Sequence, residues 1–374
     1  MKTYMFPGQG SQVRGMGGAL FDEFQELTEQ ADAILGYSIK ELCLEDPRKE
    51  LDKTQFTQPA LFVVNALSYF KRIQAAGREP DFLAGHSLGE FNALLAAGCF
   101  GFETGLKLVQ KRGQLMSHVS GGAMAAILNA TPEFIEASLK EAGLTNVELA
   151  NFNTPTQVVI SGLKSEIDAA QPLFQKGRML FYPLNTSGAF HTRFMAAAQE
   201  EFRAFLKTLD VSAPKIPVIA NVTARPYEND AVVETLSRQI ASAVKWSDSV
   251  QYLLGLGGAE QPMQFEELGH GDVLTRLVKA IGDQRKNPPK VQEISVAKKH
   301  APTSVAAAAG TLSAEEKVAA WNQSHPVGTK VRSTLLAEHT LETRTEACVL
   351  FVHRAAVYMQ GFNGYFDLDE LVPA

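Results

Sequence analysis

The sequence has few cysteines, no excess of basic charge and no long apolar run. Its three cysteines, Cys43, Cys99 and Cys348, lie far apart and fit no metal-ligand spacing, so we expect packing residues in a reducing compartment and no metal site. The net charge of −6 and the lack of a dense basic cluster argue against a nucleic-acid partner. No run approaches the roughly twenty apolar residues that span a bilayer, and the stretch before Pro7 predicts a strand rather than a secretion signal. We therefore expect a cytoplasmic protein without a membrane segment.

The overall amino-acid composition is that of an ordinary folded protein. Hydrophobic residues make up 45% and charged residues 20%, which excludes wholesale disorder and leaves material for a large core. From residue 1 to about residue 281, short apolar segments alternate with longer amphipathic ones, such as a predicted helix over 58–75 and a strand over 82–84. That alternation favours a parallel sheet covered by helices.

The pattern changes between residues 121 and 187. Strands are predicted at 123–128 and 157–161, and helices at 133–142 and 165–176. Their order suggests a small α+β subdomain of the ferredoxin-like type, inserted into the larger body.

We therefore predict an α/β fold with a C-terminal extension. The large subdomain, with an α/β-hydrolase-like parallel sheet, takes in residues 1–120 and 188–283, and the inserted subdomain takes in 121–187. Residues 284–312 are rich in proline and alanine and predict a linker. Residues 313–374 predict a small β-rich module of unassigned role.

Two local signals support that last module. The segment Ser313-Ala-Glu-Glu316 is a candidate capping box that would open a short helix. Strand-like runs from Val327 to Leu371 then alternate with a turn at 361–364.

Residues 85–89 read Gly-His-Ser-Leu-Gly, a G-x-S-x-G pattern placed where a buried strand is followed by a helix. A serine on so sharp a turn presents its hydroxyl above the sheet, and flanking glycines allow close approach of the backbone. The pattern also occurs in ordinary strand-to-helix turns. By itself it makes Ser87 a candidate nucleophile and no more.

A serine hydroxyl needs a neighbouring base to become a nucleophile, and the chain offers eight histidines. His191 is the best candidate because it follows the inserted subdomain, where the two lobes meet. It ends the segment Ser187-Gly-Ala-Phe-His191, which is small and aromatic rather than amphipathic. The alternative is a histidine satisfied by hydrogen bonds in the core.

Two further segments offer groups that a reacting acyl group would need. In the loop from Pro7 to Gln12, the Gln9 amide or nearby backbone donors could face a substrate carbonyl, and the N–H of Leu88 would be a second donor. An ordinary glycine-rich turn is the alternative. Arg112 is either a solvated surface charge or, if it points into a cleft, a bidentate grip on a carboxylate.

Taken in order, these segments resemble the malonyl-CoA:acyl carrier protein transacylases. The resemblance rests on Gln9-Gly-Ser-Gln12, Gly85-His-Ser-Leu-Gly89, Arg112-Gly113, Asn151-Phe-Asn153 before Gln157-Val-Val-Ile-Ser-Gly162, Ala189-Phe-His191 and Phe265-Glu-Glu-Leu-Gly269. It covers about residues 1 to 281. It is closest to the free-standing acyltransferases that act in trans on polyketide synthases whose modules lack one of their own.

The resemblance implies a Ser–His dyad that needs neither metal nor cofactor. Ser87 would attack the thioester of malonyl-CoA, and His191 would act as general base and then as general acid. The family orients this histidine by a backbone carbonyl, which counting back from Trp246 places at Gln239. The malonyl group would then pass to the phosphopantetheine thiol of an acyl carrier protein, for polyketide or fatty acid biosynthesis.

The resemblance also implies how the acyl group is held and chosen. Arg112 would pair with the free malonyl carboxylate, while the Gln9 region and the Leu88 N–H would hold the oxyanion. Phe190, directly before His191, matches a form associated with malonyl rather than methylmalonyl units, because a bulky ring leaves little room for a methyl branch.

This sequence departs from the family pattern in two places. It has Gly269-His270-Gly271 where many relatives have Gly-Pro-Gly. No basic residues align cleanly with those expected to meet the phosphates of CoA, which leaves only Lys176 and Arg178 as candidates. The chain after Asp283 lies outside the resemblance.

Two other functions stay open. An editing acyl hydrolase on the same fold would transfer acyl groups to water, but it would have no need of a carboxylate clamp at Arg112. An inactive scaffold, whose β-rich tail docks a synthase, would have no need of Ser87 and His191. In each case we expect a monomer.

Overall fold

The computed structural model describes residues 1–186, 188–258, 260–288, 314–333, 340–350, 354–360, 365–368 and 371–373. The chain forms two compact units, Met1–Ile294 and Ser295–Ala374. Ser187, most of the predicted linker, Ser313 and the predicted turn at 361–364 lie outside the described residues. Within the described residues, no helix is both long and apolar enough to cross a membrane.

A four-stranded parallel sheet forms the centre of the first unit. Its strands are β7 (Val218–Ile219), β2 (Phe82–Gly85), β1 (Lys2–Phe6) and β8 (Gln264–Glu267), in that order across the sheet. Consecutive side chains of a strand point to opposite faces. Tyr4 and Phe6 accordingly lie in one apolar cluster, and Met5 lies in another. Burial on both faces is typical of parallel sheets and explains the apolar strand sequences.

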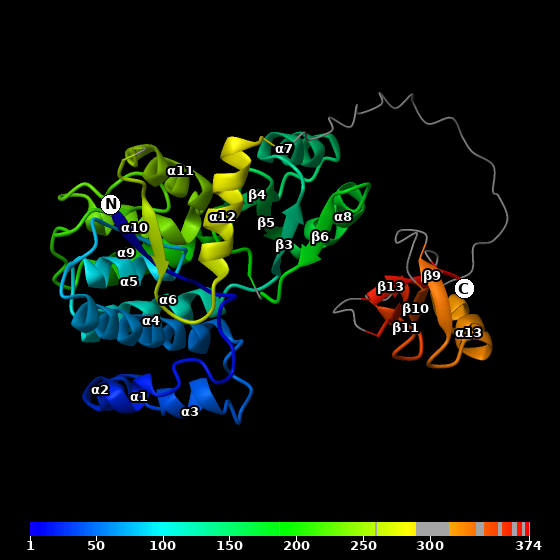
Figure 1. The fold of residues 1–374 in the computed structure, drawn as a ribbon, viewed down its shortest axis with the longest axis horizontal. Coiled ribbons are helices and arrows are strands. Elements are labelled where there is room, and N and C mark those ends of the chain that lie inside the picture. The colour runs from blue at the N-terminus through cyan, green and yellow to red at the C-terminus, as the bar shows by residue number, and fades with distance from the viewer. Residues whose placement is uncertain are drawn as a thin grey trace. The chain divides into compact units, whose positions relative to one another are not determined.

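Helices cover both faces of this sheet. The helices of the large subdomain are α1 (Leu20–Glu23), α2 (Gln25–Leu35), α3 (Ile39–Leu44), α4 (Thr54–Ala76), α5 (Gly89–Ala96), α6 (Phe102–Ser117), α9 (Ala196–Leu206), α10 (Val232–Arg238), α11 (Trp246–Leu256) and α12 (Val273–Lys286). Two 3₁₀ turns, η1 (Arg193–Met195) and η2 (Gln239–Ala241), complete it. Figure 1 shows α4 and α6 side by side, and α11 and α12 also contact each other. Helix α12 runs past the predicted end of the large subdomain at residue 283.

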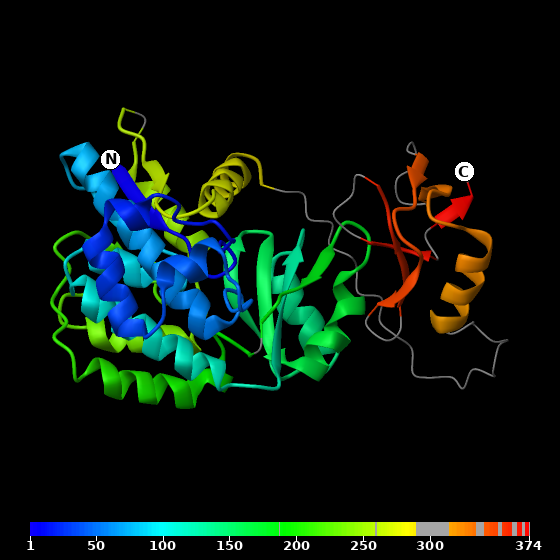
Figure 2. The same cartoon turned by 90° about the horizontal axis from the view of Figure 1, so that it is seen from below.

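The inserted subdomain has its own antiparallel sheet. Its elements are β3 (Gly122–Leu128), α7 (Pro132–Glu141), β4 (Val147–Thr154), β5 (Gln157–Leu163), α8 (Lys164–Phe174) and β6 (Leu180–Pro183). The strands lie side by side in the order β4-β5-β3-β6 (Figure 2). A β-α-β-β-α-β chain with this order is ferredoxin-like, so the predicted fold class is confirmed.

Two strands of that subdomain escaped the sequence analysis for physical reasons. Strand β4 is interrupted between Leu149 and Asn151 and again between Phe152 and Thr154, so its side chains do not alternate cleanly. Strand β6 has only four residues, and three of them are exposed. Strand β4 also joins the two subdomains, because the Phe152 N–H donates to the Val244 carbonyl at 2.9 Å.

The second unit is small and β-rich, as predicted. It contains α13 (Ala314–Ser324), a sheet of β10 (Thr340–Glu342), β9 (Lys330–Ser333) and β14 (Leu371–Pro373), and a sheet of β11 (Cys348–Leu350), β12 (Arg354–Tyr358) and β13 (Tyr365–Asp367). Both sheets are antiparallel. A separate apolar cluster that includes Val331, Val357 and Met359 packs against Trp321 of α13.

Strands β1 and β2 meet the start of α5 with backbone against backbone. A Cβ on Gly89 would lie 1.9 Å from the Phe6 carbonyl oxygen, and one on Gly85 would lie 2.0 Å from the Gly89 carbonyl carbon. Such distances are far below van der Waals contact. Glycine is therefore the residue that allows helix α5 to start directly above the sheet.

We predict that Gly89→Ala lowers the free energy of unfolding of the first unit by at least about 2 kcal/mol, since the backbone must move to admit the methyl group. Gly255→Ala is the matched control, because nothing lies within 4 Å of its added Cβ. There we expect no loss, and a gain of up to about 1 kcal/mol from helix propensity. Denaturant titrations of both variants measure the difference, and a Gly89→Ala protein as stable as wild type would contradict the packing described.

Candidate active site

The turn from β2 to α5 holds Ser87 in a strained conformation. Its φ is +50°, in the left-handed region that residues other than glycine seldom adopt. The side chain of Asn221, which follows β7, fixes this turn. Its Oδ1 accepts the Ser87 N–H at 2.7 Å, and its Nδ2 donates to the Gly85 carbonyl at 2.6 Å. The sharp strand-to-helix turn predicted from the sequence thus lies at the carboxyl ends of neighbouring parallel strands, where open α/β sheets bind ligands.

His191 lies against the Ser87 hydroxyl. Its Nε2 is 2.8 Å from Ser87 Oγ, while its Nδ1 is 3.0 Å from the Gln239 carbonyl and 3.2 Å from the Ser242 carbonyl. Two carbonyl acceptors at Nδ1 require the proton there, which leaves the Nε2 lone pair to accept the serine hydroxyl. Burial, and to a lesser extent the charge of Arg112, lower the pKa of His191 to about 3. The imidazole is therefore a neutral base.

Arg112 is buried beside the same hydroxyl, with 1% of its surface exposed. Its Nη2 donates to Ser87 Oγ at 3.2 Å and to Gln239 Oε1 at 2.9 Å, and its Nη1 donates to Gln58 Oε1 at 2.7 Å. The ring of Phe91 lies 5.5 Å from its Cζ. Among the described residues, Arg112 Nε has no hydrogen-bond partner. The solvated alternative for this arginine is wrong.

Burial lowers the pKa of Arg112 to about 10, and nearby Glu90 opposes that shift. The guanidinium therefore keeps its charge at neutral pH. It also keeps an unused N–H in a site of low polarity, where a charge-assisted hydrogen bond is strong.

Gln239 connects the three groups. Its backbone carbonyl accepts from His191, and its side-chain oxygen accepts from Arg112. Its Nε2 donates to the Ser87 carbonyl at 2.6 Å and to Glu90 Oε2 at 2.7 Å. Only the backbone contact of this residue was expected from the sequence.

Gln9 is linked to this network through a relay. Its Oε1 accepts from Thr54 Oγ1 at 3.0 Å, and Thr54 Oγ1 accepts from Gln58 Nε2 at the same distance. Gln58 in turn binds Arg112. Within the described residues, Gln9 makes no direct hydrogen bond to Ser87, and its predicted role toward a substrate carbonyl stays a prediction.

Leu88 lies at the N-terminus of α5, directly after Ser87. Its N–H is close to the loop after β1, since a Cβ on Gly8 would lie 3.5 Å from the Leu88 nitrogen and 2.3 Å from the His86 carbonyl oxygen. In the described part of the chain this N–H has no acceptor. A free N–H at the start of a helix, next to the serine, suits a developing negative charge.

The remaining predicted site residues have no hydrogen bond to Ser87, His191 or Arg112 in the described structure. Phe190 is buried in the apolar cluster of the large subdomain, with its ring near Gly188. Lys176 and Arg178 are exposed in the turn between α8 and β6. In the described structure neither side chain contacts Ser87.

Three residues at the site were missed from the sequence: Gln58, Glu90 and Asn221. Glu90 had a readable signal, because it is the one charged residue in the stretch from Leu88 to Leu95. Asn221 had one too, as a polar residue at the end of a buried parallel strand. Gln58 had no such signal in the sequence, since only the packing of α4 against distant segments brings this residue to the site.

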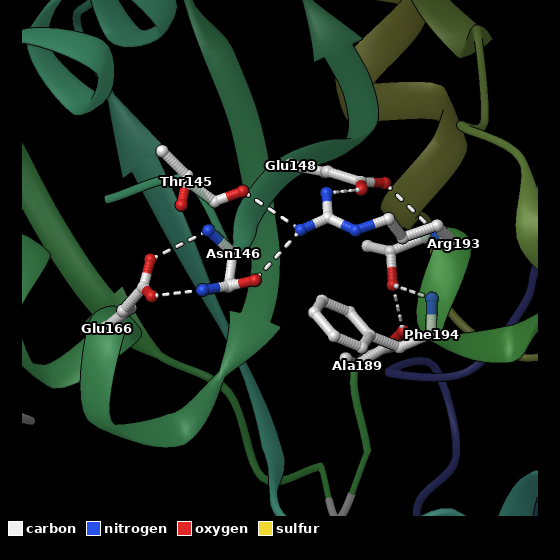
Figure 3. Close-up of polar contacts among 8 residues, drawn as sticks. Thr145, Asn146, Glu148, Glu166, Ala189, Arg193 and Phe194 are labelled. Carbon is white, nitrogen blue, oxygen red and sulfur yellow. Dashed lines mark hydrogen bonds and ion pairs between the residues drawn. The ribbon is translucent and has the colours of Figure 1, made fainter. Parts of the chain in front are cut away.

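The turn that carries His191 is anchored to the inserted subdomain by Arg193. The Arg193 guanidinium binds the Glu148 carboxylate, and its Nη2 also donates to the Thr145 carbonyl at 2.9 Å and to Asn146 Oδ1 at 3.0 Å. The Arg193 N–H donates to the same carboxylate at 3.1 Å. Figure 3 shows these contacts converging on Arg193.

Further bonds stiffen both ends of that anchor. Glu166 accepts from the backbone and side-chain N–H groups of Asn146 at 2.8 and 2.6 Å. Thr192 Oγ1 donates to the Ala189 carbonyl at 2.6 Å, which closes the turn on the other side. The geometry at the histidine thus depends on both subdomains, although no sequence pattern indicated Arg193.

No group of three or more potential metal-ligating side chains (His, Cys, Asp or Glu) occurs in the described parts of the chain.

The sequence matches the acyl transferase domain family over residues 3–315. It is 55% identical over 292 residues to the polyketide biosynthesis malonyl CoA-acyl carrier protein transacylase of Bacillus subtilis strain 168, which covers 78% of this chain and 100% of the relative. The chain belongs to the acyl transferase family. The predicted resemblance to malonyl-CoA:acyl carrier protein transacylases is therefore confirmed.

Two solved structures are similar to this acyl transferase. The malonyl CoA-acyl carrier protein transacylase from Burkholderia pseudomallei has a TM-score of 0.75 and 60% identity, and the match covers 77% of this chain and 99% of that one. A malonyl-transacylase in complex with a type II polyketide synthase acyl-carrier protein has a TM-score of 0.70 and 33% identity, covering 75% and 93%. Most of the second unit lies beyond the family match, which ends at residue 315.

The lowered pKa of His191 predicts an unusual pH profile for this acyl transferase. Because the base form persists until the pH falls toward about 3, modification of Ser87 should show no ionisation near the ordinary histidine pKa of about 6.5. The rate of inactivation by the uncharged reagent phenylmethylsulfonyl fluoride, measured between about pH 5 and 8 and corrected for reagent hydrolysis, tests this. A rate that falls with a midpoint near 6.5 in Glu90→Gln, which lacks the buried carboxyl group whose pKa of about 7 lies in the same range, would show that His191 titrates normally.

Proposed function

We propose that this chain transfers a malonyl group from malonyl-CoA, through an ester on Ser87, to the phosphopantetheine thiol of an acyl carrier protein. We further propose that it acts in trans, for a polyketide synthase. The names of the relatives support the reaction. The observation that carries the proposal for this chain is the 3.2 Å contact between a buried arginine, Arg112, and the Ser87 hydroxyl.

The first half-reaction follows from the positions of the two side chains. His191 Nε2 takes the proton of Ser87 Oγ as the oxygen attacks the thioester carbonyl carbon. The other imidazole proton stays on Nδ1, hydrogen-bonded to the Gln239 and Ser242 carbonyls, which stabilise the imidazolium that forms. The tetrahedral intermediate carries its charge on the former carbonyl oxygen, next to the Leu88 N–H. Its collapse releases CoA, whose sulfur receives the proton from His191.

The second half-reaction reverses these steps with a different thiol. The phosphopantetheine thiol gives its proton to His191 and attacks the ester carbonyl. Ser87 Oγ leaves and regains the proton. Since CoA departs before the carrier protein reacts, ping-pong kinetics are expected. No step needs a cofactor or a metal.

Arg112 accounts for the choice of acyl group. In a malonyl thioester a single methylene separates the carboxylate from the reacting carbonyl, so the anion site must lie close to the nucleophile. Arg112 Nη2 touches Ser87 Oγ, and Arg112 Nε is unused in the described structure. A carboxylate that accepted from Nε and Nη2 would satisfy the orphaned donor with the planar geometry that guanidinium prefers.

The alternatives fit these residues less well. An editing hydrolase of uncharged acyl groups gains nothing from a buried cation, whose burial is costly. An inactive scaffold gains nothing from the Ser87 to His191 contact. A docking role for the second unit, contacts of Lys176 and Arg178 with CoA phosphates, a monomeric state and a cytoplasmic location stay predictions.

We predict that malonyl-CoA leaves one malonyl adduct on the wild-type protein and none on Ser87→Ala. Arg112→Ala should reduce malonyl labelling by at least about 100-fold, as expected for removal of one partner of a buried charge pair, and should reduce acetyl labelling far less. Intact-mass analysis with malonyl-CoA and acetyl-CoA measures both adducts. Addition of a holo carrier protein then separates transfer from hydrolysis.

Lys111→Ala is the control, since it removes a neighbouring charge from the same helix without touching the site. It should label like wild type with both thioesters. An adduct on Ser87→Ala would overturn the nucleophile, and equal losses of malonyl and acetyl labelling in Arg112→Ala would overturn the carboxylate clamp.

Phe190 is predicted to limit the size of the acyl group. Phe190→Val should raise the ratio of methylmalonyl to malonyl transfer by about 10- to 100-fold, because rejection of one methyl group is worth about 1 to 3 kcal/mol. Phe174→Val, in the core of the inserted subdomain, should lose similar packing without changing the ratio. Competition between the two thioesters measures it, and an unchanged ratio in Phe190→Val would remove Phe190 from the selectivity pocket.

A further inference from the structure

Glu90 is a fully buried carboxyl group that the proposed reaction does not use. It lies on α5, three residues after Ser87, with 0% of its surface exposed. No basic group lies within ion-pair distance among the described residues. Its Oε1 accepts from Tyr227 Oη at 2.6 Å and from the Asn221 N–H at 3.0 Å, and its Oε2 accepts from Gln239 Nε2 at 2.7 Å. A buried carboxylate is costly even with such donors, so its position calls for a reason.

The reason lies in the amide of Gln239. An amide offers an oxygen on one side and two N–H donors on the other. The Ser87 carbonyl and Glu90 Oε2 are both acceptors, so the Gln239 nitrogen must face them. The Gln239 oxygen is then directed at Arg112, which can only donate.

We propose that Glu90 is a positioning residue that holds the Gln239 amide with its oxygen toward Arg112 and thereby sets the preference for an acyl group that carries a carboxylate. The inference rests on the proposed role of Arg112. Glu90 would act on Arg112 only through Gln239, since Glu90 itself touches neither the substrate nor Ser87.

An amide of the same size cannot replace Glu90. The Asn221 N–H is a fixed donor, so the oxygen of a Gln side chain would occupy the Oε1 position. Its NH₂ group would then face Gln239 Nε2, donor against donor. If Gln239 turned over, its oxygen would face the Ser87 carbonyl and its nitrogen would face Arg112. Each arrangement places a donor against a donor or an acceptor against an acceptor. We therefore expect Glu90→Gln to displace Arg112 with little change in side-chain volume.

Protonation of Glu90 on Oε2, the oxygen that faces Gln239, should have the same effect as that substitution. Burial raises the pKa of Glu90 to about 7, against the lowering influence of Tyr227, Asn221, Gln239 and Arg112. A proton on Oε2 would oppose the Gln239 nitrogen. The carboxylate is present above pH 7 and is lost as the pH falls through that value.

The other charged and titratable groups around Glu90 stay in one form over this range. The pKa of Tyr227 is raised well above its ordinary value, so the phenol remains neutral. Arg112 remains charged, because its lowered pKa is still about 10. The pKa values of His86 and His191 are both lowered by burial, so both imidazoles remain neutral. A change in acyl preference near pH 7 therefore reports Glu90.

The test is the ratio of kcat/KM for malonyl-CoA to that for acetyl-CoA, measured on the full chain between about pH 6 and 8.5. In wild type this ratio should fall as the pH drops through about 7. In Glu90→Gln it should be about 10- to 100-fold lower than in wild type at high pH, and independent of pH. Tyr227→Phe is the control at high pH, since it removes a donor to Glu90 but leaves the contact with Gln239, and its ratio should stay close to that of wild type.

A folded Glu90→Gln protein with the wild-type ratio would overturn the inference, as would equal losses for the two thioesters. If that variant does not fold, a wild-type ratio that is constant across pH 7 overturns it instead. Failure of the proposed function looks different, because wild type would then form no malonyl adduct on Ser87. A wild type that malonylates and an Arg112→Ala variant that does not, together with an unchanged ratio in Glu90→Gln, would overturn the role of Glu90 alone.

Discussion

Arg112 holds a full positive charge in a buried site without a carboxylate within ion-pair distance in the described structure. Removal of a guanidinium from water is costly, and here amide oxygens from Gln58 and Gln239 offset only part of the cost. A site arranged in this way favours an anionic ligand, and the proposed binding of the malonyl carboxylate to Arg112 would place that ligand beside Ser87.

The rest of the site holds the Arg112 guanidinium and the Ser87 hydroxyl next to each other. Asn221 fixes the strained turn of Ser87 from one strand, and the Gln239 segment holds both His191 and Arg112 from another element. Because Gln239 binds all three groups, a shift of one is transmitted to the others. The Arg193 anchor adds the inserted subdomain to this arrangement. The strained backbone conformation of Ser87 persists because several independent contacts hold it in place.

The sequence was sufficient for the fold class and for the positions of Ser87, His191 and Arg112, because strand ends and motif order locate them. It was insufficient for contacts between elements far apart in the chain. Glu90 and Gln239 are separated by 149 positions, and only packing brings them together. The irregular strand β4 and the short strand β6 were missed because neither shows the alternation on which strand prediction depends.

The central claim is that the carboxylate of the acyl group, and not its carbonyl alone, is recognised at Arg112. A crystal structure of the enzyme trapped as its malonyl ester measures this directly. We expect the ester on Ser87 Oγ, with the free carboxylate within hydrogen-bond distance of Arg112 Nε and Nη2. An ester whose carboxylate points into solvent, with Arg112 still bound only to Gln58 and Gln239, would contradict the account.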